Sequence, residues 1–172
     1  MDFINNENGT YTIRWEEYSN GKDLTSWGGE ETGKIEEVTI KPEELCYIDI
    51  DRNTIHFTGS AFICNICTSN IIILANKFKE LLPNLLKVQA DIFESRKVGD
   101  YRINPDNISF YLKGTASAPD KIGLVKMGNI LFHGTTNLLL NDLECTYFER
   151  VYLPLRKTNI AKIKEKLNNK KN

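Results

Sequence analysis

The sequence predicts an α+β fold in which a mostly antiparallel sheet carries a short central helix and a C-terminal amphipathic helix. Short segments rich in β-branched and aromatic residues recur between turn-forming residues, which is typical of antiparallel strands. Residues 75–82 place apolar side chains on one helical face before Pro83, and residues 158–167 do the same near the C-terminus. A length of 172 residues suits one core, so we expect residues 1–172 to form a single α+β domain.

The first half of the chain contains five segments that resemble strands. Pro42 separates the second from the third. In the third, Cys46, Ile48 and Ile50 share one parity, which predicts one common face. Glycines around Gly28 predict a long loop after the first segment. The five segments are residues 10–15, 34–40, 45–50, 54–59 and 71–73.

A short helix is predicted over residues 75–82. Phe78 and Leu81 fall on one of its faces, and Pro83 is placed to stop it. Residues 86–93 then alternate apolar and polar side chains, as in a strand with one covered face. The preceding helix is the nearest cover for that face.

Four further strands are predicted in the second half. Gly128 separates two of them, and Pro154 ends the last, which is rich in aromatic residues. Thr158 is suited to be the N-cap of the C-terminal helix, and we expect residues 168–172 to fray. The four strands are residues 107–113, 123–127, 129–133 and 144–153.

Charge is distributed unevenly along the chain. The net charge is −1, but residues 1–60 hold 13 Asp and Glu against 5 Lys and Arg, whereas residues 61–172 hold 10 against 17. Such asymmetry is usual for solvated faces, and it is also what a charged partner on one side would require. The longest apolar run, residues 71–75, is too short for a membrane span, and residues 1–8 lack the basic and apolar regions of a signal peptide. We therefore expect a cytoplasmic protein without a membrane partner.

Cys64 and Cys67 have the spacing of a metal-binding or redox pair. A structural zinc site needs a second pair of ligands, but Cys46 and Cys145 are isolated and neither histidine has a partner nearby in the sequence. We expect four free thiols that pack as small apolar side chains, and no metal or cofactor. A catalytic cysteine–histidine pair stays open, because such residues meet in space rather than in sequence.

The candidate partner-binding residues lie in the acidic first part of the chain. Glutamates occur there in adjacent pairs, and neighbours on a strand point to opposite faces, so these pairs do not predict a metal cage. They predict a diffuse acidic surface that attracts a basic protein. We assign to this surface Trp27, Glu30, Glu31, Glu36 and Glu37.

Two other segments suggest binding of phosphate or nucleic acid only superficially. The glycines beside Trp27 do not have the spacing of a phosphate-binding loop, and two glutamates follow them. The lysine-rich residues 162–171 have no interleaved aromatic residue. We therefore interpret the first as a surface loop and the second as a solvated helix face, and nucleic acid is a disfavoured partner.

Residues 70–82 read Asn-Ile-Ile-Ile-Leu-Ala-Asn-Lys-Phe-Lys-Glu-Leu-Leu, and residues 88–93 read Val-Gln-Ala-Asp-Ile-Phe. This pattern resembles immunity proteins of bacterial polymorphic toxin systems, which carry a short apolar strand, a small helix and another strand. The resemblance implies a non-catalytic cytoplasmic protein that binds and blocks a cognate toxin. It assigns no functional residue.

The leading hypothesis is a non-catalytic binding protein, specifically an immunity protein that neutralises a basic toxin. The first alternative is a structural or assembly protein of a phage or mobile element, which predicts a defined homo-oligomer. The second alternative is a small enzyme that uses Cys64, Cys67 or His133.

Overall fold

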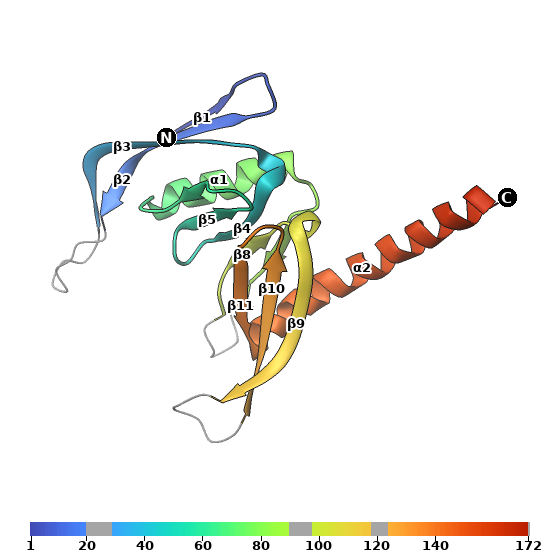
Figure 1. The fold of residues 1–172 in the computed structure, drawn as a ribbon. Coiled ribbons are helices and arrows are strands. Elements are labelled where there is room, and N and C mark those ends of the chain that lie inside the picture. The colour runs from blue at the N-terminus through green and yellow to red at the C-terminus, as the bar shows by residue number, and fades with distance from the viewer. Residues whose placement is uncertain (20–28, 90–97, 118–123, 172) are drawn as a thin grey trace.

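The computed structural model describes residues 1–19, 29–89, 98–117 and 124–171. These residues form eleven strands and two α-helices, with every strand pair antiparallel, so the predicted α+β class is confirmed (Figure 1). The elements are β1 (Asp2–Asn5), β2 (Tyr11–Ser19), β3 (Glu30–Ile40), the 3-10 helix η1 (Pro42–Glu44), β4 (Leu45–Asp49), β5 (Thr54–Phe57), β6 (Phe62–Ile63), α1 (Thr68–Leu81), β7 (Leu86–Val88), β8 (Tyr101–Ile103), the 3-10 helix η2 (Pro105–Asn107), β9 (Ile108–Ser117), β10 (Leu124–Phe132), β11 (Asn137–Asn141) and α2 (Asp142–Lys171).

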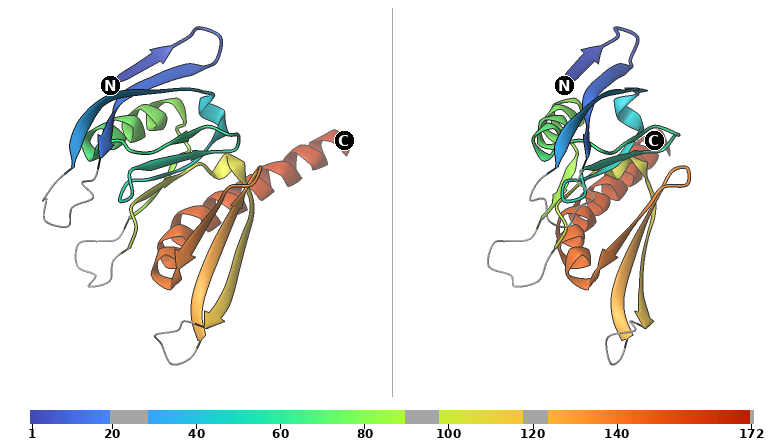
Figure 2. Two further views of the ribbon diagram at one scale, coloured as in Figure 1. Left: turned by 60° about the vertical axis from the view of Figure 1, so that its left-hand side comes forward. Right: turned by 90° about the vertical axis from the view of Figure 1, so that its left-hand side faces the viewer.

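The strands form three sheets. The N-terminal sheet has the order β1-β2-β3, the central sheet β6-β5-β4-β8-β7 and the C-terminal sheet β11-β10-β9. Figure 2 shows α1 beneath the N-terminal sheet and α2 along one side of the C-terminal sheet. Strands β1, β6, β8 and β11 are absent from the sequence prediction, because two to five residues are too few to show a clear alternation.

Strand β7 ends at Val88, so it covers only the start of the strand predicted over residues 86–93. The remainder of that prediction, from residue 90 on, lies outside the described residues.

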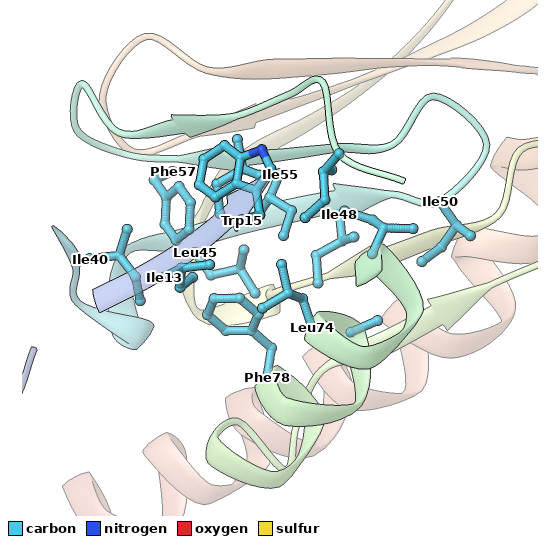
Figure 3. Close-up of a cluster of buried hydrophobic side chains, with 14 of the residues drawn as sticks. Ile13, Trp15, Ile40, Leu45, Ile48, Ile50, Ile55, Phe57, Leu74 and Phe78 are labelled. Atoms are coloured by element: carbon cyan, nitrogen blue, oxygen red, sulfur yellow. The ribbon is translucent and has the colours of Figure 1, made fainter. Parts of the chain in front are cut away.

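The first core lies between α1, the N-terminal sheet and the central sheet (Figure 3). Trp15 of β2 and Phe78 of α1 are among its largest side chains, and both are at least nine-tenths buried. The other buried members are Ile13, Ile40, Leu45, Ile48, Ile50, Ile55, Phe57, Ile63, Ile66, Ile71, Leu74, Ala75 and Leu85.

Helix α1 begins at Thr68, so the short strand predicted over residues 71–73 is wrong, and the helix predicted after it starts earlier than expected. Its buried residues Ile71, Leu74 and Phe78 recur with helical spacing, whereas the two isoleucines between the first two are exposed. The β-branched composition favours a strand, but packing of one face against the core outweighs that local preference.

Strand β4 separates the two cores. Its register with β5 shifts between Leu45 and Tyr47, which marks a bulge. Because of this shift, Leu45 and Ile48 both belong to the first core, whereas Cys46 and Tyr47 belong to the second. The prediction that Cys46, Ile48 and Ile50 share one face is therefore wrong for Cys46.

The second core joins the central sheet to the C-terminal sheet and α2. Phe148 of α2 is fully buried and packs edge-on against Tyr111 of β9, with ring centroids 5.0 Å apart. The buried members are Cys46, Tyr47, Val88, Val98, Tyr101, Ile103, Ile130, Phe132, Leu138, Leu140, Cys145, Tyr147 and Phe148.

Helix α2 begins at Asp142, so the strand predicted over residues 144–153 is wrong, and the predicted helix start at Thr158 lies inside the helix. A capping box specifies the observed start. The Asn141 Oδ1 accepts a hydrogen bond from the Glu144 N–H at 2.8 Å, and the Glu144 Oε1 accepts one from the Asn141 N–H at 3.0 Å. The aromatic composition of this segment favours a strand and conceals the cap.

Pro154 lies inside α2 rather than at the end of a strand. An interior proline removes one helical hydrogen bond and costs about 3 kcal/mol. The buried residues of α2 all precede it, and the Thr158 hydroxyl donates to the Pro154 carbonyl at 3.0 Å instead of capping a helix. The helix continues through Lys171, over residues expected to fray, because no glycine or proline occurs after Pro154. We call residues 155–171 the arm.

A single strand, β10, replaces the two strands predicted on either side of Gly128. Gly128 is buried where α2 packs on the sheet, and a Cβ at this position would collide with the Cys145 Sγ. The glycine therefore permits close approach of the helix and does not break the strand.

We expect Gly128→Ala to destabilise the fold by about 1–3 kcal/mol, because the added methyl group overpacks the contact between β10 and α2. Urea denaturation measures this loss. Gly114→Ala on β9 is the matched control, because a Cβ there meets open space, and it should change the free energy of unfolding by less than about 0.5 kcal/mol. Equal losses in both variants would contradict the packing argument.

Candidate functional site

The four predicted glutamates all lie on β3, an edge strand of the N-terminal sheet. The strand begins at Glu30, earlier than predicted, so Glu30 and Glu31 belong to the strand and not to a loop. Glu30, Glu31 and Glu37 are exposed, and Glu36 is half-buried. Trp27, the remaining predicted residue, lies outside the described residues.

The ladder between β2 and β3 places Glu36 and Glu37 on opposite faces. Glu36 lies opposite Trp15, which belongs to the first core, and Glu37 lies opposite Arg14, which is exposed. Directly opposed residues share a face of the sheet, so Glu36 borders the inner face and Glu37 the outer face. The glutamates of β3 therefore do not form a single flat patch.

Glu36 and Glu37 each have a cation beside them. The Arg14 Nη2 lies 2.6 Å from the Glu37 Oε2, and the Lys34 Nζ lies 2.6 Å from the Glu36 Oε1. These pairs are largely exposed, so they contribute little to stability. They do reduce the net negative charge that these two glutamates offer to a partner.

Glu16 and Glu31 form a like-charged pair on the same hairpin. The Glu16 Oε1 accepts a hydrogen bond from the Gly33 N–H at 2.9 Å, which orients Glu16. A hydrogen bond with Glu16, together with the negative charge of Glu16, raises the pKa of Glu31. The hairpin thus holds two carboxyl groups together against their repulsion, and a cation from a partner would relieve it.

A groove of about 390 Å³ lies along the edge of β3, between residues 36–39 and the region around β6. Trp15 and Val38 contribute apolar surface, and Glu36 contributes a carboxylate. Phe62 and Cys64 line the groove from the region around β6. An apolar wall with a carboxylate at its border suits the long stem and charged end of a lysine or arginine side chain.

A second cavity, of about 250 Å³, lies where the central sheet meets the start of α2. Two nearly buried carboxylates line it, Asp49 with 4% and Glu144 with 6% of its surface exposed. The other lining residues are Asp51, Arg52, Gly99, Tyr101 and Asn141. We call this cavity the acidic pocket.

Backbone N–H groups already occupy both buried carboxylates of the acidic pocket. Glu144 accepts hydrogen bonds from the N–H groups of Gly99 and Asn141, each at 3.0 Å. Asp49 accepts one from the Arg52 N–H at 3.1 Å. Burial raises the pKa of Asp49, and the Arg52 hydrogen bond and charge oppose that rise. These contacts close a turn and cap a helix, which is a structural role.

All four cysteines are free thiols, as predicted. Cys46 and Cys145 are buried, whereas Cys64 and Cys67 are partly exposed. Burial raises the pKa of Cys64, and the charges of nearby glutamates raise it further, so its thiolate form is disfavoured. Within the described ranges, no group of three or more His, Cys, Asp and Glu residues is arranged to hold a metal ion.

Each histidine pairs with a hydroxyl group. The His133 Nδ1 lies 2.8 Å from the Ser109 Oγ on the exposed surface, and the His56 Nε2 lies 3.0 Å from the Thr54 Oγ1. The His56 ring also stacks on Tyr47 with ring centroids 4.2 Å apart, and burial lowers the pKa of His56. The hydrogen bonds of both rings thus go to hydroxyl groups rather than to thiols.

No protein-family model, curated protein or solved structure matches the chain significantly. In the part of the chain that the structure describes, neither helix combines the length and apolar character that crossing a membrane requires.

Sequence reasoning did not single out the two pairs of carboxylates that the fold brings together. Glu16 belongs to an adjacent acidic pair in the sequence, but its nearness to Glu31 depends on the β2–β3 register. One part of the acidic pocket could have been predicted from the sequence, because Asn141 and Glu144 have the spacing of a capping box. Nothing in the sequence links Glu144 to Asp49.

We compare the free energy of unfolding of Asp49→Asn with that of the native chain. We expect the difference to change in favour of Asp49→Asn as the pH rises from about 4 toward 7. Burial raises the folded-state pKa of Asp49 above its unfolded value, so the native fold loses stability as the pH rises through that interval. The asparagine keeps an acceptor for the Arg52 N–H and carries no charge. Urea denaturation across this pH range measures the difference. Asp106→Asn, at an exposed position, is the control, and a pH-independent difference for Asp49→Asn would contradict the prediction.

Proposed function

We propose that this chain is a non-catalytic cytoplasmic binding protein that neutralises a basic protein, namely an immunity protein against a cognate bacterial toxin. The contact surface in this proposal is the acidic hairpin, which we define as β2 and β3 with the groove beside them. The observation that carries the proposal is the clustering of glutamates on β2 and on the edge strand β3, with Glu16 beside Glu31.

The edge position of β3 supports a protein partner. An unpaired edge strand offers backbone N–H and C=O groups to an extended segment of another chain. Its glutamates would disfavour pairing with a second copy of the same strand and favour a basic segment instead. Arg14 and Lys34 offset the charges of Glu37 and Glu36, and the other four glutamates of β2 and β3 keep the net charge of the hairpin negative.

The chemistry of the nucleophile candidates supports a non-catalytic role. The thiolate of Cys64 is disfavoured, and the hydrogen bonds of His56 and His133 go to hydroxyl groups. The carboxylates of the acidic pocket are occupied by backbone N–H groups. To act as an acid or a base, the carboxylate of Asp49 or Glu144 would have to release a backbone N–H group during the reaction.

The resemblance to immunity proteins is the reason for proposing a toxin as the basic partner. Its first part, residues 70–82, lies in α1 as far as Leu81, whereas of its second part, residues 88–93, Val88 ends β7 and residues 90–93 lie outside the described residues. The apolar strand expected before that helix is itself part of α1. The resemblance therefore supports the proposal through its helical part alone.

Co-expression with the product of the adjacent gene tests the function. We expect the two proteins to purify together and the toxic activity of the partner to disappear in the complex. A co-expressed partner whose toxicity this chain leaves unchanged would contradict the proposed function.

We expect the double reversal Glu16→Lys with Glu31→Lys to weaken this complex by about tenfold or more at low salt, because like charges then face the basic partner. Isothermal titration measures the affinity. The double reversal Glu80→Lys with Asp106→Lys, at exposed positions outside the hairpin, makes the same charge change and should alter the affinity by less than about threefold. If both variants bind equally tightly, the hairpin is the wrong surface.

A further inference from the structure

The outer face of the C-terminal sheet is apolar and exposed. Phe110, Leu112 and Leu139 are 65%, 55% and 57% exposed, whereas the opposite face packs on α2. The strand register places Leu112, Asn129 and Leu139 in one row across the three strands. Figure 2 shows α2 on one side of this sheet. An exposed apolar row of this kind is typical of an interaction surface.

Two hollows extend this apolar face. One, of about 270 Å³, is lined in part by Leu112, Met127 and Leu139. The other, of about 380 Å³, is lined in part by Phe110 and Leu131. Met127 and Leu131 are only half-buried, so the apolar surface continues from one end of the face to the other.

The arm carries a second exposed apolar surface. Ile160, Ile163 and Leu167 follow one another at intervals of three and four residues and are 44%, 57% and 55% exposed. Figure 1 shows the arm extending away from the three sheets toward the C-terminus. Helices in proteins draw most of their stability from the packing of an apolar face, so an exposed stripe of this kind favours a partner that covers it.

The arm and the sheet face match in size and polarity. The stripe from Ile160 to Leu167 is about 10 Å long, and Leu112 and Leu139 are two strand spacings apart, also about 10 Å. The arm holds seven Lys and Arg residues and one Glu, so two arms repel each other. The polar residue in the middle of the sheet row, Asn129, is neutral and does not repel the arm.

The exposed area is sufficient for a stable contact between two copies. Six half-exposed apolar side chains, three on each surface, offer on the order of 100 Å² each, or about 600 Å² per copy. Met127, Leu131 and the stems of the arm lysines add to this area. A standard interface buries about 800 Å² per partner, and a two-fold symmetric pair uses both surfaces of each copy.

We propose that this chain forms a homodimer in which the arm of each copy packs on the outer face of the C-terminal sheet of the other copy. Helices then cover both faces of that sheet, as in other layered folds. The site is separate from the acidic hairpin, so it does not rest on the proposed function.

Sedimentation equilibrium of the full chain at high micromolar concentration tests the proposal. We expect the unmodified chain to be a dimer, and Ile163→Asp and Leu112→Asp each to raise the dissociation constant by about tenfold or more. Ile73→Asp is the matched control, because Ile73 is an exposed isoleucine on α1 with 46% of its surface accessible, and it should leave the dimer intact. Circular dichroism establishes that each variant is folded.

Mixing the two variants identifies which surfaces meet. The Ile163→Asp variant keeps an intact sheet face and the Leu112→Asp variant keeps an intact arm, so an equimolar mixture should form a heterodimer more readily than either variant forms a homodimer. A monomeric unmodified chain overturns the proposal. Loss of the dimer in Ile163→Asp alone, or in Leu112→Asp alone, also overturns it, because those results indicate contact between two arms or between two sheets.

Discussion

Both cores depend on the bulge in β4, where all five residues of the strand are buried. A bulge takes backbone groups out of the regular ladder, so they need other partners. The buried Asn104 supplies them, because its side chain donates to the Leu45 carbonyl at 3.0 Å and its N–H donates to the Cys46 carbonyl at 2.9 Å. The bulge shifts the alternation of side chains along β4. Leu45 and Ile48 therefore face α1, and Cys46 and Tyr47 face the C-terminal sheet. One strand thus holds two packed layers in place.

The carboxylates of the acidic first sixty residues have two physical roles. Asp49 is buried beside Glu144, and hydrogen bonds from backbone N–H groups hold both. Glu16 and Glu31 stay on an exposed hairpin, where a hydrogen bond with Glu16, together with the charge of Glu16, raises the pKa of Glu31. The excess negative charge of this region therefore does not act as one surface. Six of its thirteen Asp and Glu residues lie on β2 and β3, where both charge and the backbone groups of an edge strand are accessible.

Helix α2 consists of a packed part and a projecting part, and Pro154 lies near the boundary. Before it, the helix buries Cys145, Tyr147 and Phe148 and is joined to the sheet by the capping box. After it, the arm is basic and exposes one apolar stripe. The acidic hairpin and the basic arm belong to opposite ends of the chain and to different layers (Figure 1). In the two proposals made above, the hairpin contacts a basic partner and the arm contacts the apolar sheet face of a second copy.

The sequence alone determined the α+β class, the strands of residues 10–15, 34–40, 45–50 and 107–113, and the apolar stripe of the arm, because alternation and helical spacing are local properties. Tertiary structure decided the rest. β-branched or aromatic composition favours strands at residues 71–73 and 144–153, yet both segments are helical because their buried residues meet a core along one helical face. Strand register decides which core Cys46 faces and brings Glu16 close to Glu31. Register arises from contacts between residues distant in the sequence.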